Sequence, residues 1–220
     1  MKKIILASTL VSLSAIGFMS IAMDNEGAAL SATLPYKNQM IALDVGVGDV
    51  LLVASDDDQI KMSVTLEPSN NTHTNNKHNC DSHSHATIPM NKRKIQTSVE
   101  HGLIKIALND QSHVTQNWLI HMPKDADIDL HLGVGNTQLN GLQGEVSIEI
   151  GVGSAKAYVS DANYQKMKVE TGVGKVAFQL PAGQLNRDSH LVGEELVWKG
   201  KGQSKMDIEV GVGDIDISTL

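Results

Sequence analysis

The chain has 220 residues, of which 41% are hydrophobic and 3% aromatic, and its formal net charge is −7 at pH 7. This length suffices for one domain with a core of its own, and the acidic balance argues against binding to nucleic acid or to anionic membrane surfaces. The single cysteine excludes an internal disulfide.

The first 22 residues have the three parts of a Sec-type signal peptide. Lys2 and Lys3 form a basic start, an apolar run extends over 4–19, and Ser20-Ile21-Ala22 offers a small-x-small cleavage site. An uncleaved N-terminal anchor is the competing interpretation, because the apolar run almost reaches membrane-spanning length; the serines within it favour cleavage. No later segment is apolar enough to cross a bilayer. We therefore expect a periplasmic, secreted or cell-surface protein, with a linker over 23–39.

Residues 40–68 alternate apolar and polar side chains and predict strands, which an insert over 69–92 interrupts. The insert has almost no apolar residues and predicts a disordered, low-complexity loop. It holds the only cysteine and four of the nine histidines, so the candidate metal ligands are His73, His78, Cys80, His83 and His85. Thiolate and imidazole are ligands that zinc, copper and nickel prefer. The alternative is a polar loop without metal, because a disordered loop gives ligands little support.

The next segment predicts an N-terminal hairpin region. Two alternating runs lie within 95–108 and meet at Glu100-His101-Gly102, which is a turn sequence. A strand over 118–123 ends at a proline, and 124–127 form a turn into the repeats that follow.

The rest of the chain is organised by Gly-Val-Gly, a motif that occurs five times. The copies begin at Gly46, Gly133, Gly151, Gly172 and Gly211, and a degraded copy contains Gly193. From Gly133 onward the spacing is roughly twenty residues, which is typical of stacked repeat architectures.

Apolar residues alternate with polar ones on both sides of each motif, but their parity changes across it. Around Gly151, the apolar residues Ile148, Ile150 and Val152 are followed by Ala155 and Ala157. A bend at the second glycine would keep both halves facing one core. Glycine tolerates such a bend because it has no Cβ.

These features predict an all-β fold, namely a parallel β-solenoid or β-helix-like stack of ~20-residue coils with two short strands each. Equivalent residues would stack in chain order, with Leu132 over Ile150, then Thr171, Val192 and Val210. The last coil would be an open end with unpaired strand groups, a route to self-association.

Two interpretations that assign the glycine motif a binding function have less support. A phosphate-binding loop requires a helix after the glycines, whereas a strand pattern follows each copy here. A calcium-binding repeat requires an acidic residue at one fixed place in successive turns, and Lys175 occupies that place in one copy. We therefore interpret the glycines as corners of the fold.

Catalytic patterns are missing from the sequence, which has neither a Ser-His-Asp order with a nucleophile elbow nor His-Glu-x-x-His. Outward-facing Glu149, Glu170 and Glu209 would stack in register with His131 on one face. That face is either simply solvated or a polar binding stripe. A polysaccharide-cleaving β-helix enzyme is the least supported alternative.

The strand over 118–123 that ends in proline and the coils over 128–153 with the pattern apolar-x-apolar-x-Gly resemble the bacterial putative adhesin domain. The resemblance covers most of 40–220 apart from the insert. It implies an exported, envelope-associated β-solenoid without an established catalytic site. We therefore expect a non-enzymatic structural or adhesive module that binds an envelope protein or a glycan. The alternative function is periplasmic binding of a transition metal by the insert.

Overall fold

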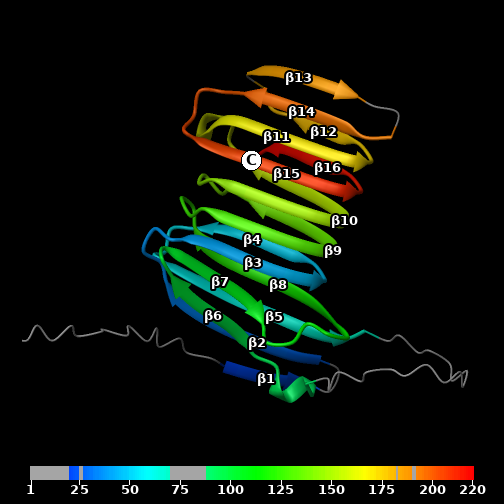
Figure 1. Ribbon diagram of the computed structural model, residues 1–220. Helices are drawn as coiled ribbons and strands as arrows, with labels where there is room; N and C mark the ends of the chain where they lie inside the picture. Colours follow the sequence, from blue (N-terminus) through cyan, green and yellow to red (C-terminus); the bar gives the residue numbers. More distant parts are fainter. Residues whose placement is uncertain (1–19, 25–26, 70–87, 182, 190–191) are drawn as a thin grey trace, which may run out of the picture.

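The described part of the chain is all-β in the computed structural model, as the sequence predicts (Figure 1). The structure describes residues 20–24, 27–69, 88–181, 183–189 and 192–220. The strands of the first half are β1 (Ser20–Asp24), β2 (Gly27–Pro35), β3 (Met40–Val47), β4 (Val50–Ser55), β5 (Gln59–Pro68), β6 (Ile95–Glu100), β7 (Leu103–Leu108) and β8 (Val114–Pro123). Those of the second half are β9 (Ile128–Asn140), β10 (Val146–Val159), β11 (Tyr164–Val173), β12 (Val176–Gln179), β13 (Gln184–Ser189), β14 (Glu194–Lys199), β15 (Ser204–Val212) and β16 (Ile215–Thr219).

The helical segments of the described residues are two short 3-10 turns, η1 (Met90–Lys92) and η2 (Asp161–Asn163). Within the same residues, no helix is long and apolar enough to span a membrane. The region 23–39, predicted to be a linker, contains strand β2, whose Ala28, Leu30 and Leu34 side chains are buried. The predicted hairpin is confirmed, since β6 pairs antiparallel with β7 around the turn at His101-Gly102.

The second glycine of each motif makes the predicted bend. Gly48, Gly135, Gly153, Gly174 and Gly213 all have positive φ angles, between 140° and 152°. In β9, Leu130 and Leu132 are buried before the motif, and Thr137 and Leu139 are buried after it. The change of parity in the sequence thus corresponds to a backbone corner that keeps both halves facing one core.

The valine inside the motif faces outward, which corrects the sequence prediction that it continues the apolar face. The motif valines are Val47, Val134, Val152, Val173 and Val212, and each is 43–49% exposed. Strict alternation would place them in the core, but the alternation breaks at the first glycine of the motif; in β10, for example, Gly151 and Val152 are both exposed. The core is instead formed by the aliphatic residues on either side of the corner.

Each corner separates two strand segments, and each segment belongs to its own series of paired strands. Figure 1 shows the strands of both series stacked along the molecule. Before the corner the order is β6-β7-β3-β9-β10-β15-β11-β14-β13, and after it the order is β1-β2-β5-β8-β4-β9-β10-β16-β12. The central pairs, such as β9 with β10, are parallel and in register, whereas β6–β7, β11–β14 and β5–β8 are antiparallel. The sheet is therefore mixed, and the predicted parallel solenoid is not confirmed. A tight turn such as the one between β6 and β7 can join only antiparallel strands.

The last repeat does not lie last in the stack, contrary to the sequence prediction. Leu132 is opposite Ile150 as expected, but Ile150 is next opposite Val210, and Val210 in turn is opposite Thr171. Strands β15 and β16 are thus inserted between β10 and the pair β11–β12. All copies carry nearly the same motif in the same register, so the repeat itself does not determine their spatial order. Strand β16, close to the end of the described chain, consequently lies inside the sheet between β10 and β12, and the edges at this end of the stack are β12 and β13.

The Gln111 side chain replaces a missing strand at the first corner. Strand β7 pairs with β3 only from Met40 to Leu43, which leaves the backbone of Asp44 and Gly46 without a strand partner on that side. Gln111 Oε1 accepts a hydrogen bond from Gly46 N at 2.5 Å, and Gln111 Nε2 donates to Asp44 O at 3.3 Å. One side-chain amide therefore continues the pairing by one step.

Gln111→Ala is expected to lower the free energy of unfolding by about 1–3 kcal/mol, because it leaves a partly buried backbone N–H without an acceptor. Chemical denaturation measures the effect. Gln96→Ala, at an exposed position on β6, should change stability by less than about 0.5 kcal/mol. Equal effects of the two substitutions would show that the amide does not cap the sheet.

Candidate binding surfaces

A row of carboxylate side chains, with one histidine among them, crosses the outer face of the sheet on the strand segments before the corner. We call the aligned residues the acidic row: Asp44, His131, Glu149, Glu209, Glu170 and Glu195, on β3, β9, β10, β15, β11 and β14. The predicted alignment of the three glutamates with His131 is confirmed. The structure adds Asp44 and Glu195, and it places Glu209 between Glu149 and Glu170. Sequence reasoning missed this central position because it assumed that the repeats stack in chain order.

Only some carboxylates of the acidic row have a basic side chain beside them. His131 Nδ1 lies 3.2 Å from Glu149 Oε2, and Lys168 Nζ lies 2.7 Å from Glu170 Oε2. The Glu170 carboxylate raises the pKa of Lys168. Among the described residues, Glu209 has no cationic partner. Neighbouring strands are about 4.8 Å apart, so the carboxylates repeat at that interval, and like charges directly opposite each other are unfavourable.

The exposed motif valines form a second row beside the first. We call them the valine row: in spatial order Val47, Val134, Val152, Val212 and Val173. Val192, which is 64% exposed, extends this row, because its carbonyl accepts a hydrogen bond from Gly174 N at 3.0 Å. The acidic and valine rows run side by side, three residues apart along each strand. Together they make what we call the corner surface.

The polar residues just after the corner have structural roles. Asp49 Oδ1 accepts hydrogen bonds from Asn136 N at 2.9 Å and from Asn136 Nδ2 at 3.1 Å. Asp214 Oδ1 accepts one from Lys175 N at 2.8 Å. These carboxylates satisfy backbone N–H groups of the next strand, which agrees with the interpretation of the motif as a corner.

The predicted metal ligands His73, His78, Cys80, His83 and His85 lie outside the described residues, so metal binding by them stays a prediction. In the part of the chain that the structure describes, no three His, Cys, Asp or Glu side chains come together to hold a metal ion.

The chain that follows 70–87 is anchored by residues that the sequence did not single out. Asp110 Oδ2 accepts a hydrogen bond from Ile88 N at 2.9 Å, and the buried Arg93 donates to the carbonyls of Asp110 and Ser112 at 2.5 and 2.7 Å. Hydrogen bonds from the backbone N–H groups of Ser112 and Ile88 lower the pKa of Asp110 to about 2. No repeat or motif marks these positions, so only the fold reveals them.

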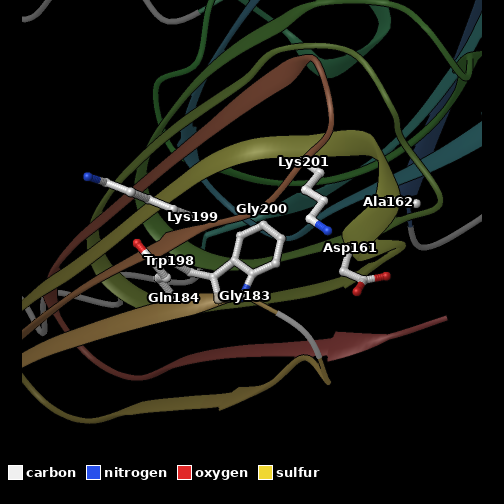
Figure 2. Close-up of a pocket in the computed structure, with 8 residues that line it drawn as sticks. All are labelled: Asp161, Ala162, Gly183, Gln184, Trp198, Lys199, Gly200 and Lys201. Carbon is white, nitrogen blue, oxygen red and sulfur yellow. The ribbon is translucent and has the colours of Figure 1, made fainter.

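A pocket of about 700 Å³ opens at the other end of the strands from the corner surface. Figure 2 shows the residues that line it. It lies where β14 ends, next to η2 and the turn into β15. Its walls are Asp161, Ala162, Gly183, Gln184, Trp198, Lys199, Gly200 and Lys201. The sequence gives no sign of it, because its residues come from three separate stretches and belong to no motif.

Comparisons with known proteins give two structural neighbours. One is described as a putative cell adhesion protein from Clostridium sporogenes, with 14% identity, a TM-score of 0.48, and coverage of 94% of this chain and 100% of that one. The other is described as a putative adhesin from Bacteroides fragilis, with 11% identity, a TM-score of 0.25, and coverage of 86% and 96%. No protein-family model matches the chain, and no curated protein matches it in sequence.

Proposed function

We propose that this protein is an exported, non-enzymatic adhesive module of the bacterial envelope, which binds a cationic partner protein through the corner surface. The observation that carries the proposal is the side-by-side alignment of the acidic and valine rows. The signal-peptide pattern of residues 1–22 and the sequence resemblance to the adhesin domain support export to the periplasm or the cell surface. In this proposal the two-strand coils form a solenoid whose corners present the binding surface.

The chemistry of the two rows defines the partner. Exposed valines in a continuous row offer apolar area that a partner can cover. The adjacent carboxylates repel anions and attract lysine and arginine, and such complementarity mainly sets specificity and the rate of association. The matching partner surface therefore has a stripe of apolar side chains bordered by basic ones. Long, regular faces of this kind are the binding surfaces that stacked-repeat proteins generally use.

Binding of an amphipathic helical peptide of lysine and leucine to the mature chain, measured by calorimetry, tests this proposal. We expect binding that weakens as salt is added, because exposed charges are screened. Reversing two charges of the row, in Glu149→Lys/Glu209→Lys, should weaken binding by at least about tenfold.

The matched control is Asp58→Lys/Glu100→Lys, which makes the same change in net charge at exposed carboxylates outside the row. It should leave the affinity within about twofold of the unaltered chain, because remote exposed charges are largely screened. If both double variants lose the same affinity, the attraction comes from net charge alone and the corner surface is not the binding site. Export is tested separately, by cell fractionation and by the mass of the mature chain.

A further inference from the structure

The pocket beside Trp198 lies away from the corner surface and has the features of a separate ligand site. Lys199 at the end of β14 is opposite Lys166 near the start of β11, whereas the valine row crosses β11 at its other end. A pocket of about 700 Å³ falls within the size range of small-molecule sites. Any ligand held here would leave the acidic and valine rows free.

The indole of Trp198 is the central group of the pocket wall. Only 2% of this residue is exposed, yet its Nε1–H has no hydrogen-bond partner among the described residues. Trp118, the other tryptophan, donates from Nε1 to Gln116 Oε1 at 3.1 Å. Trp198 Nε1 is not one of the fully buried unpaired side-chain atoms, which among the described residues are Arg93 Nε and Thr137 Oγ1, so it keeps some contact with solvent. The unpaired donor of Trp198 is therefore available to a ligand.

Two glycines allow the backbone to pack directly against this indole. A Cβ at Gly183 would lie 2.1 Å from Trp198 Nε1, and a Cβ at Gly200 would lie 2.1 Å from Trp198 Cη2. A side chain at either position would collide with the ring. The walls around the indole are consequently small, and Ala162 adds to their apolar character.

Charges of opposite sign stand at the pocket without pairing to each other. In Figure 2 the Lys201 ammonium points toward Asp161 and the indole, whereas the Lys199 side chain points away. Lys201 and Asp161 form no ion pair with each other or with another described residue. The pocket thus offers two donors, the Lys201 ammonium and the indole N–H, and one strong acceptor, the Asp161 carboxylate.

We propose that this pocket binds a sugar acid, meaning a saccharide unit that carries one carboxylate. The carboxylate accepts hydrogen bonds from Lys201 and from Trp198 Nε1, and sugar hydroxyls donate to Asp161. The C–H face of the ring packs against Ala162 and the two glycines. A neutral apolar ligand would leave these groups desolvated and unpaired. A dianionic phosphate would be repelled by Asp161, with only one ammonium to balance it.

Trp198 itself reports on the pocket. In Trp118→Phe, Trp198 is the only remaining indole, so its fluorescence can follow titration with trigalacturonate. Neutral galactotriose, galactose 6-phosphate and free glutamate serve as comparison ligands. We expect a Kd below about 1 mM for trigalacturonate and affinity at least about tenfold weaker for each of the others. If Trp118→Phe does not fold, calorimetry on the unaltered chain makes the same comparison.

Lys201→Ala and Asp161→Asn should each weaken trigalacturonate binding by at least about fivefold, while melting temperatures stay unchanged, because both side chains lie outside the core. Lys156→Ala, at an exposed position on β10 away from the pocket, should leave the affinity unaltered, and so should Glu149→Lys/Glu209→Lys. No binding up to about 10 mM, equal binding of galactotriose, preference for glutamate or the phosphate ester, or unchanged affinity in Lys201→Ala would each overturn the proposal. These results do not test the proposal that the corner surface binds a cationic partner protein.

Discussion

Replacing Gly153 by alanine is expected to lower the free energy of unfolding by more than about 3 kcal/mol and to abolish cooperative folding at ambient temperature. Gly153 has a φ angle of 148°, which an L-residue adopts only under strain. A Cβ there would lie 1.7 Å from the carbonyl oxygen of Gly135 on the neighbouring strand. Both atoms belong to the parallel pairing of β9 with β10, so relief requires separating two central strands. Circular dichroism during thermal and chemical denaturation measures the loss.

Gly102→Ala is the matched control for this prediction. Gly102 also has a positive φ angle, 81°, but no atom lies within 4 Å of the place where its Cβ would be. The substitution should cost only the backbone strain, about 1–2 kcal/mol. Similar losses in the two variants would mean that positive φ alone requires glycine. If Gly153→Ala loses much more stability than Gly102→Ala, the difference in the free energy of unfolding comes from the close approach of neighbouring corners.

The same close approach explains why the sequence predicts so much of the local fold. Each corner needs glycine for a physical reason, so the motif appears in the sequence, and the change of parity across it predicts the bend. The alternation also identifies most core residues, such as Ile148 and Ile150. It misassigns Val152, because the alternation breaks at the first glycine of the motif and the valine that follows turns outward.

The order in which the repeats lie side by side in the sheet could not be predicted in the same way. Nearest-neighbour pairing energies of nearly identical repeats are nearly equal, so the repeat pattern does not decide which copy follows which. The position of β15 and β16 between β10 and the pair β11–β12 depends on the connections and on the antiparallel β13–β14 hairpin, whose residues show only the degraded motif around Gly193. The pocket at Trp198 was hidden for the same reason, since Asp161 and Lys201 come together only through this order.

Disulfide formation between paired cysteines is expected to show that β15 lies between β10 and β11, because one cysteine pair should cross-link and the other should not. In a Cys80→Ser background, Glu149→Cys/Glu209→Cys places two thiols on adjacent strands, because Glu149 and Glu209 are partners in the β10–β15 pairing. Their Cα atoms are then about 4.8 Å apart, which is within the span of a disulfide. Mild oxidation should cross-link this variant almost completely, as seen by thiol counting and by peptide mass.

The companion variant Glu149→Cys/Glu170→Cys should stay reduced under the same conditions. Strand β15 lies between these two positions, since Glu209 pairs with Glu149 on one side and with Glu170 on the other. Two strand spacings separate the cysteines by about 9.6 Å, beyond the roughly 7 Å that a disulfide can bridge. Stacking in chain order would give the reverse pattern, because β11 would then follow β10 directly. The two cross-linking yields therefore decide between the orders, and the inserted order is the one that brings Glu209 into the centre of the acidic row.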